Sequence, residues 1–145
     1  MTSPQQILLI EDNPADIGLV RQALLEHQVH GELQVISDGE SVLQFIDRLD
    51  ADVTLPAPHL LLLDLHLPKR DGAEILDYLR ASKRCCTTPV VILSSSPAMK
   101  WQHRAKENAV LYHFHKPSNL GNFLELGAIV KDVLLRSDRA VRTMP

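Results

Sequence analysis

Short hydrophobic runs alternate along this chain with longer stretches in which apolar residues recur every three or four positions. Continuous apolar runs of this length predict strands buried on both faces, and the wider spacing predicts amphipathic helices. Strands are expected at residues 7–10, 33–36, 59–63, 90–93 and 110–115. Helices are expected after Asn13, after Ser37, from Asp71, at 97–108 and at 118–136, with a frayed tail after them.

Five strands that alternate with five helices predict an α/β fold, in which a parallel sheet carries helices on both faces. Right-handed crossovers favour a doubly wound layout with the flavodoxin-like strand order 2-1-3-4-5. Local signals support the first helix, because Asn13 can cap it and Pro14 suits its first position. The 145 residues are expected to form one domain over 5–136, with a tail at 137–145 and no effector domain.

Composition and charge narrow the classes of function. The net charge of −3 gives no electrostatic case for binding nucleic acid. No apolar run is long enough for a membrane span, and the N-terminus lacks the pattern of a signal peptide, so a cytoplasmic protein is expected. The adjacent Cys85 and Cys86 make no disulfide framework, which agrees with a reducing compartment.

Polar side chains follow four of the predicted strands. Glu11 and Asp12 follow the first strand, and Asp64 ends the leucine run of the third. Ser94 ends the fourth strand and Lys116 follows the fifth. Strands 1, 3, 4 and 5 are neighbours in the expected order, so these side chains should share one pocket at the sheet edge where ligands bind.

These residue types indicate phosphoryl chemistry. Crowded carboxylates repel one another unless they are protonated or bridged by a cation, and an oxygen-rich site suits Mg²⁺. Beside such a cation, Asp64 can attack a phosphoryl group and form an aspartyl phosphate. Lys116 would neutralise one phosphoryl oxygen, and the Ser94 hydroxyl would donate to another.

The run from Asp64 to Glu74 reads DLHLPKRDGAE. It resembles the D-x-x-[ML]-P-x-x-D-G-x-E pattern of response-regulator receiver domains, the CheY-like superfamily. The resemblance covers residues 5–136, and the spacings of 30 residues from Asp64 to Ser94 and 22 from Ser94 to Lys116 are typical of that family.

This resemblance implies a role for each site residue. Asp64 would be the phosphoacceptor, with Ser94 and Lys116 beside it. The protein ligands of Mg²⁺ would be Glu11, Asp12, Asp64 and the backbone carbonyl of His66. The bond between Lys116 and Pro117 would be a cis peptide, which aims the lysine into the pocket.

The residue three positions before the lysine departs from the family. Many receivers carry an aromatic residue there, which rotates upon phosphorylation, whereas this chain has His113. Tyr112 and Phe114 flank it, but strand alternation places them on the opposite face. Either His113 takes the switch role together with Ser94, or the aromatic half of the switch is absent.

The opening IEDNPAD and the long loop before the third strand resemble single-domain regulators paired with phytochrome-type histidine kinases. The expected function is to accept a phosphoryl group from a phosphohistidine and to signal through protein contacts, or to act as a phosphate shuttle or sink, without turning over metabolites. A Mg²⁺-dependent aspartyl-phosphate hydrolase is one alternative, but it wants a second acid at the position of His66. A phosphorylation-independent docking module is another, although such a module would be expected to lack the pocket.

The predicted helix at 118–136 carries apolar residues on more than one stripe. Part of that surface can cover the sheet, and the remainder predicts a homodimer through the fifth helix and the fifth strand. The alternative is a helix shielded by its own C-terminal segment. Trp101 is expected either in the core beside the fourth helix or as a partner-facing anchor.

Overall fold

The computed structural model describes residues 4–95 and 112–143, with side chains up to Arg136. The predicted fourth helix at 97–108 and Trp101 lie outside the described residues. The strands are β1 (Gln5–Ile10), β2 (Gly31–Ile36), β3 (Leu60–Asp64), β4 (Val90–Ser94) and β5 (Tyr112–His115). The helices are α1 (Pro14–Glu26), α2 (Gly39–Ala51), α3 (Gly72–Ala81), α5 (Leu120–Phe123) and α6 (Leu126–Thr143).

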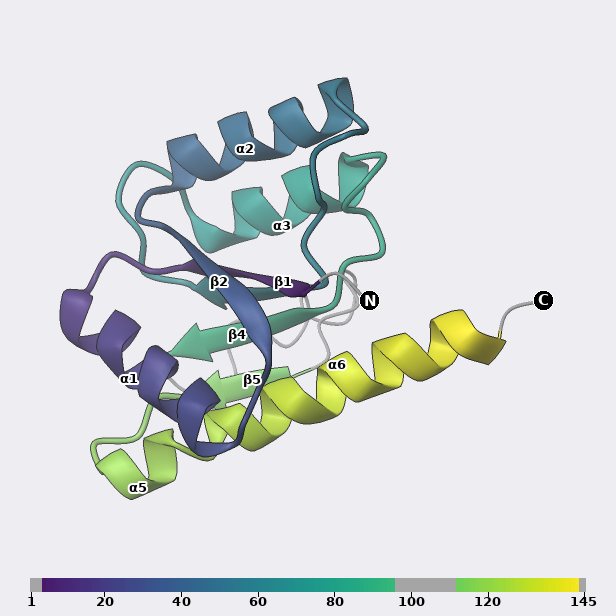
Figure 1. Ribbon diagram of the computed structural model, residues 1–145. Helices are drawn as coiled ribbons and strands as arrows, with labels where there is room; N and C mark the ends of the chain where they lie inside the picture. The colour runs from purple at the N-terminus through teal and green to yellow at the C-terminus, as the bar shows by residue number, and fades with distance from the viewer. Residues whose placement is uncertain (1–3, 96–111, 144–145) are drawn as a thin grey trace.

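All five strands are parallel and form one sheet in the order β2-β1-β3-β4-β5. Figure 1 shows α2 and α3 on one face of this sheet, and α1, α5 and α6 on the other. The predicted α/β class and strand order are confirmed. In this order the carboxyl ends of β1, β3, β4 and β5 lie side by side, which is where the polar residues of the sequence were expected to meet.

The four leucines of β3 explain why this strand is central. Leu60 and Leu62 belong to the core cluster that also contains residues of α1 and α6, whereas Leu61 and Leu63 belong to the cluster shared with α2 and α3. All four side chains are fully buried. Because successive side chains of a strand point to opposite faces, a strand that is covered on both faces needs an unbroken apolar run.

Polar caps set the starts of the helices. The Asn13 side chain accepts hydrogen bonds from the backbone nitrogens of Ala15 and Asp16, at 2.9 and 3.3 Å. Asp38 and Asp71 cap α2 and α3 in the same way, by accepting from backbone nitrogens of the first turn. These caps hold the loops after β1 and β3 in place, and those loops carry the acidic residues.

The C-terminal part differs from the single helix expected at 118–136. The helix is divided into α5 and α6, and bonds that span three residues, such as Gly127 N to Leu124 O, tighten the chain between them. The α6 helix also continues to Thr143, whereas a frayed tail was predicted after Arg136. Residues 128–143 contain neither glycine nor proline, so nothing in the local sequence ends the helix earlier.

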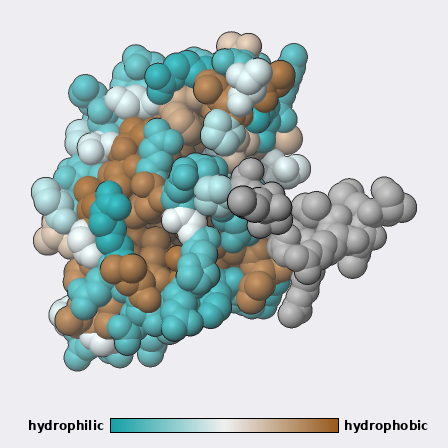
Figure 2. Space-filling view, viewed as in Figure 1, coloured by the Kyte–Doolittle hydropathy of each residue, from teal (hydrophilic) through white to brown (hydrophobic). Residues whose placement is uncertain are grey.

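The surface in view is mixed in polarity. Figure 2 shows apolar groups across the middle of the molecule, over the edge strand β2, with polar groups above and below. Leu33 and Val35 of this strand are half-buried against the core, and Glu32 and Gln34 between and beside them are exposed. No helix among the described residues is both long enough and apolar enough to cross a membrane.

Candidate phosphoacceptor site

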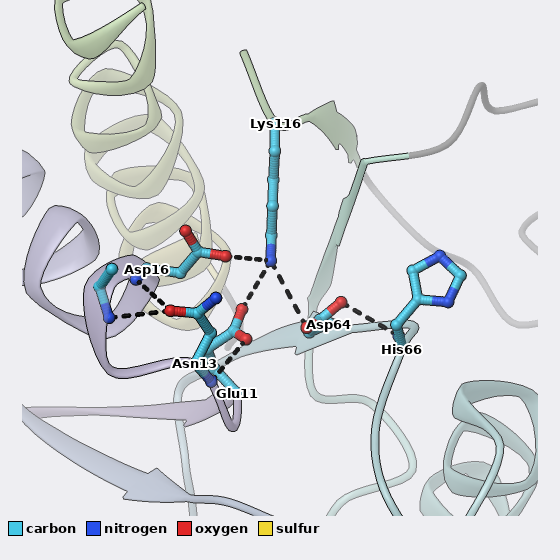
Figure 3. A network of polar contacts seen from close by, with 7 residues as sticks. Glu11, Asn13, Asp16, Asp64, His66 and Lys116 are labelled. Atoms are coloured by element: carbon cyan, nitrogen blue, oxygen red, sulfur yellow. Dashed lines mark hydrogen bonds and ion pairs between the residues drawn. The ribbon is translucent and has the colours of Figure 1, made fainter. Parts of the chain in front are cut away.

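Asp64 lies at the carboxyl end of β3, and its residue is only 4% exposed. One carboxylate oxygen, Oδ1, accepts a hydrogen bond from the backbone nitrogen of His66 at 3.0 Å. The other, Oδ2, lies 3.4 Å from the Lys116 ammonium (Figure 3). The turn after β3 therefore holds one face of the carboxylate, and the lysine approaches the other.

Glu11 and Asp12 follow β1 on the neighbouring strand. Glu11 is fully buried, and its Oε1 accepts from the backbone nitrogen of Asn13 at 3.2 Å. Asp12 is exposed at the edge of the site. Oxygens of Glu11, Asp12 and Asp64 can be chosen that all lie within 4.8 Å of one another. The structure brings together the three carboxylates that the sequence predicted as metal ligands.

Lys116 follows the edge strand β5, and its side chain extends along the carboxyl ends of the strands to these carboxylates. Its backbone nitrogen donates to the Ser94 carbonyl oxygen at 2.7 Å, which continues the pairing of β5 with β4 beyond His115. Its Nζ donates to Glu11 Oε2 and to Asp16 Oδ2, at 2.8 Å each. Burial lowers the pKa of the lysine, but the hydrogen bonds to Asp16 and Glu11 outweigh it, so the pKa is raised and the ammonium stays charged.

The site holds more carboxylates than cationic groups among the described residues, because Glu11, Asp16 and Asp64 surround the one Lys116 ammonium and Asp12 lies beside Glu11 and Asp64. Burial raises the pKa of Glu11 to about 7; the hydrogen bond to Lys116 opposes this shift, and neighbouring Asp64 adds to it. The protein disfavours the ionised form of Glu11, and a bound cation would stabilise that form.

The donor set fits a divalent cation. Three convergent carboxylates, one of them exposed, offer hard oxygen ligands on a site that water can still reach. A cation there would neutralise the excess charge and polarise an incoming phosphoryl group. The fourth protein ligand, the His66 carbonyl, is implied by the family resemblance and remains a prediction; its residue is exposed beside Asp64.

Ser94 and His113 occupy the strands beside Asp64. Ser94 is fully buried at the end of β4, one strand from Asp64, as predicted. Tyr112 and Phe114 pack into the core cluster with α1 and α6, so the expected alternation places His113 on the opposite face. The His113 Nε2 is buried and has no hydrogen-bond partner among the described residues, and burial lowers the pKa of the ring. Its switch role remains a prediction.

One predicted feature of the site is wrong. The described residues include Lys116 and Pro117 and contain no cis peptide bond, so the bond between these two residues is trans. The cis and trans forms of a peptide bond before proline differ in free energy by only about 0.5–1 kcal/mol, so the local sequence does not decide between them. The lysine still reaches the carboxylates, because its long side chain spans the remaining distance.

Asp16 is the residue that sequence reasoning missed. It lies in the first turn of α1, and its carboxylate contacts Lys116. The sequence did indicate that Asp16 lies near the site, because it comes five residues after Glu11, at the start of the helix that leaves the site. Its partner is 100 residues away, so only the folded chain could identify the contact.

Comparison with known proteins now identifies the family. The family model of the response regulator receiver domain matches residues 7–126. This chain belongs to that family, whose members are signalling modules that accept a phosphoryl group in two-component systems. The match favours neither the hydrolase nor the docking module considered from the sequence.

Individual relatives agree with this class. Response regulator Rcp1 of Synechocystis sp. is 38% identical over 93 residues, which cover 64% of this chain and 63% of Rcp1, less than two thirds of that protein. The probable methanogenesis regulatory protein FilR2 of Methanothrix harundinacea is 32% identical over 137 residues, which cover 94% of this chain and 88% of FilR2.

Solved structures of phytochrome response regulators have the same fold. The phosphorylated cyanobacterial regulator RcpA matches with a TM-score of 0.79 and 29% identity, over 92% of this chain and 95% of that one. The Mn²⁺-bound form of Rcp1 matches with a TM-score of 0.77 and 31% identity, over 89% and 93%. The bacteriophytochrome response regulator AtBRR matches with a TM-score of 0.69 and 33% identity, over 91% and 94%. Receiver domains bind a divalent metal, as the Rcp1 structure illustrates.

Proposed function

We propose that Asp64 accepts a phosphoryl group from the phosphohistidine of a histidine kinase, with Mg²⁺ held by Glu11, Asp12, Asp64 and the His66 carbonyl. The observation that carries this proposal is the Asp64 carboxylate, 3.4 Å from the Lys116 ammonium and within one group of three convergent carboxylates. A nucleophile, a cation site and a fixed positive charge are the parts that phosphoryl transfer needs.

In the proposed step, an Asp64 oxygen attacks phosphorus, a P–O bond forms and the P–N bond to the imidazole breaks. The electron pair of that bond returns to the imidazole nitrogen, and the ring leaves as neutral imidazole because its other nitrogen carries a proton. Lys116 binds one phosphoryl oxygen, and the Ser94 hydroxyl donates a hydrogen bond to another. Mg²⁺, when bound, supplies charge neutralisation for the carboxylates and the incoming group. Water then attacks phosphorus and the P–O bond to Asp64 breaks, which regenerates the carboxylate and releases phosphate that carries a proton from the water.

Intact-protein mass spectrometry tests the phosphoacceptor. The protein is incubated with Mg²⁺ and acetyl phosphate, and an adduct of about 80 Da, one phosphoryl group, is expected. The adduct should be absent in Asp64→Asn and present in Asp71→Asn, a matched control in the same loop. Asp71 caps α3 by accepting from the Ala73 nitrogen, and asparagine can keep that bond. An adduct that persists in Asp64→Asn would place the acceptor elsewhere.

We further propose that the kinase is a phytochrome-type histidine kinase in the cytoplasm. The similarity to RcpA, Rcp1 and AtBRR, at 29–33% identity over most of the chain, supports this pairing. A purified phosphorylated bacteriophytochrome kinase should transfer its label to Asp64 faster than a histidine kinase of an unrelated sensor class. Equal rates from both kinases would remove the phytochrome assignment and leave the phosphoacceptor role intact.

The output is proposed to be a change in protein contacts, or the removal of phosphate from the kinase as a shuttle or sink. A homodimer through β5 and α6 is part of this proposal. Leu135 on α6 is 50% exposed, and Figure 1 shows this helix extending beyond the rest of the fold. Sedimentation velocity should detect a dimer whose fraction rises with protein concentration and is smaller in Leu135→Glu. A monomer at every concentration would remove the dimer.

A further inference from the structure

Asp16 and Glu11 hold the same ammonium from two directions. Asp16 Oδ2 and Glu11 Oε2 each lie 2.8 Å from Lys116 Nζ. Figure 3 shows Asp16 approaching from the first turn of α1, on the side away from Asp64. Asn13 caps this helix, so the Asp16 carboxylate is not needed to satisfy the backbone nitrogens of the first turn. Its structural partner is the lysine.

The ammonium has three N–H donors, and three carboxylate oxygens lie around it. Glu11 and Asp16 make the two short contacts, and Asp64 lies at 3.4 Å. Glu11 and Asp64 belong to the group of described residues that can share a cation, whereas Asp16 does not. A cation that draws on those two carboxylates leaves Asp16 as the acid that still holds the lysine.

We propose that Asp16 is a positioning residue for phosphoryl transfer, an inference that rests on the proposed role of Asp64. Asp16 keeps one N–H of Lys116 occupied while Glu11 turns to the cation. The other two donors then point toward Asp64 and the phosphoryl oxygens. The lysine side chain is 12% exposed and that of Asp16 is 23% exposed, so water competes only weakly for this contact.

Two variants separate positioning from charge. Asp16→Asn removes the charge but keeps an oxygen that can accept from Lys116, whereas Asp16→Ala removes both. Each lowers the negative charge equally, so each should raise the half-saturating Mg²⁺ concentration by a similar factor. At saturating Mg²⁺, the maximal rate of phosphorylation by acetyl phosphate should fall about tenfold in Asp16→Ala and stay within about threefold of wild type in Asp16→Asn.

A second measurement follows the lysine without any phosphoryl transfer. The protein in Mg²⁺ is treated briefly with an amine-acetylating reagent, and each lysine is quantified by peptide mass. Lys116 should be modified several times faster in Asp16→Ala than in wild type or Asp16→Asn, because a released ammonium is more exposed to solvent. The exposed Lys131 serves as the internal reference. Glu40→Ala is the matched control, since Glu40 is also a first-turn acid with a basic partner, Arg70, outside the site.

Equal maximal rates and equal Lys116 modification in the two Asp16 variants would overturn the proposal. Asp16→Leu, which keeps the shape without an acceptor, replaces the alanine variant if that protein does not fold. A wild-type protein that takes up no phosphoryl group would overturn the proposed function as well. A wild type that is phosphorylated on Asp64, with indistinguishable variants, would overturn the role of Asp16 alone.

Discussion

Lys116 and Glu11 are 105 residues apart in the sequence and share a 2.8 Å hydrogen bond inside the domain. Their strands are not neighbours, because β3 and β4 lie between β1 and β5. The lysine side chain therefore crosses the carboxyl ends of two strands, with Asp64 beside its path. This contact joins the residue after β1 to the residue after β5. The net charge of the site therefore depends on the protonation of Glu11.

The raised pKa of Glu11 predicts a pH-dependent response to Mg²⁺. The folded value is about 7, against 4.5 for an ordinary glutamate, and burial is the main cause. The proton on Glu11 therefore stabilises the metal-free fold, and this contribution is lost as the pH rises through about 7. A metal ligand must be deprotonated, so added Mg²⁺ should raise the melting temperature more at about pH 8 than at about pH 6. Thermal melts with Mg²⁺ and with a chelator measure both trends.

Glu11→Gln is the control for that titration. Glutamine keeps an oxygen that can accept from Lys116 but cannot ionise. The metal-free variant should lose the fall in stability between about pH 4.5 and about pH 7, and it should bind Mg²⁺ more weakly at every pH. A wild-type slope that survives unchanged in Glu11→Gln would assign the titration to another group.

His113→Phe should raise the free energy of unfolding by about 1 kcal/mol, because it removes a buried ring nitrogen that has no partner among the described residues. Burial holds the pKa of His113 below its ordinary value, so this residue destabilises the fold as the pH falls below about 6.5. The difference in free energy of unfolding between His113→Phe and the wild type should therefore increase as the pH is lowered, as urea denaturation can measure. His115→Phe is the control on the same strand, and no gain is expected there, since His115 is exposed. A less stable His113→Phe would show that the nitrogen has a partner.

Gly127→Ala and Gly18→Ala should have opposite effects on stability. A Cβ at Gly127 would collide with the carbonyl oxygen of Ala23, where α6 crosses α1, so a loss of about 1–3 kcal/mol is expected. A Cβ at Gly18 would meet nothing within 4 Å, so the gain in helix propensity of about 0.5–1 kcal/mol should appear alone. Chemical denaturation of both variants measures the difference, and a stabilising Gly127→Ala would mean that the two helices are not in close contact.

Gln28→Gly should stabilise the protein, although glycine usually weakens a fold. Gln28 follows the end of α1 with φ 52°, in the left-handed region. Relief of that conformation is worth about 1–2 kcal/mol and exceeds the entropic cost of glycine, about 0.5–1 kcal/mol. Gln22→Gly, at an exposed position inside α1, should lose about 1 kcal/mol. Melting curves that shift in the same direction for both variants would contradict the strained turn.

Much of the fold was predictable because its signals are local. The leucines of β3 required a strand covered on both faces, and the acidic and amide residues at 13, 38 and 71 marked helix starts that the structure confirms. The gathering of Glu11, Asp12 and Asp64 also followed from the sequence, because parallel strands in a known order bring their carboxyl ends to one edge.

The sequence by itself thus determined, through periodicity and spacing, the alternation of strands with helices and the carboxylates at the ends of β1 and β3. The strand order was predicted with the help of the right-handed crossover rule. The tertiary structure decided the rest: the division of α5 from α6, the trans bond before Pro117 and the contact of Asp16 with Lys116. Each of these depends on where segments distant in sequence come to lie, and the free-energy differences involved are too small for local sequence to specify.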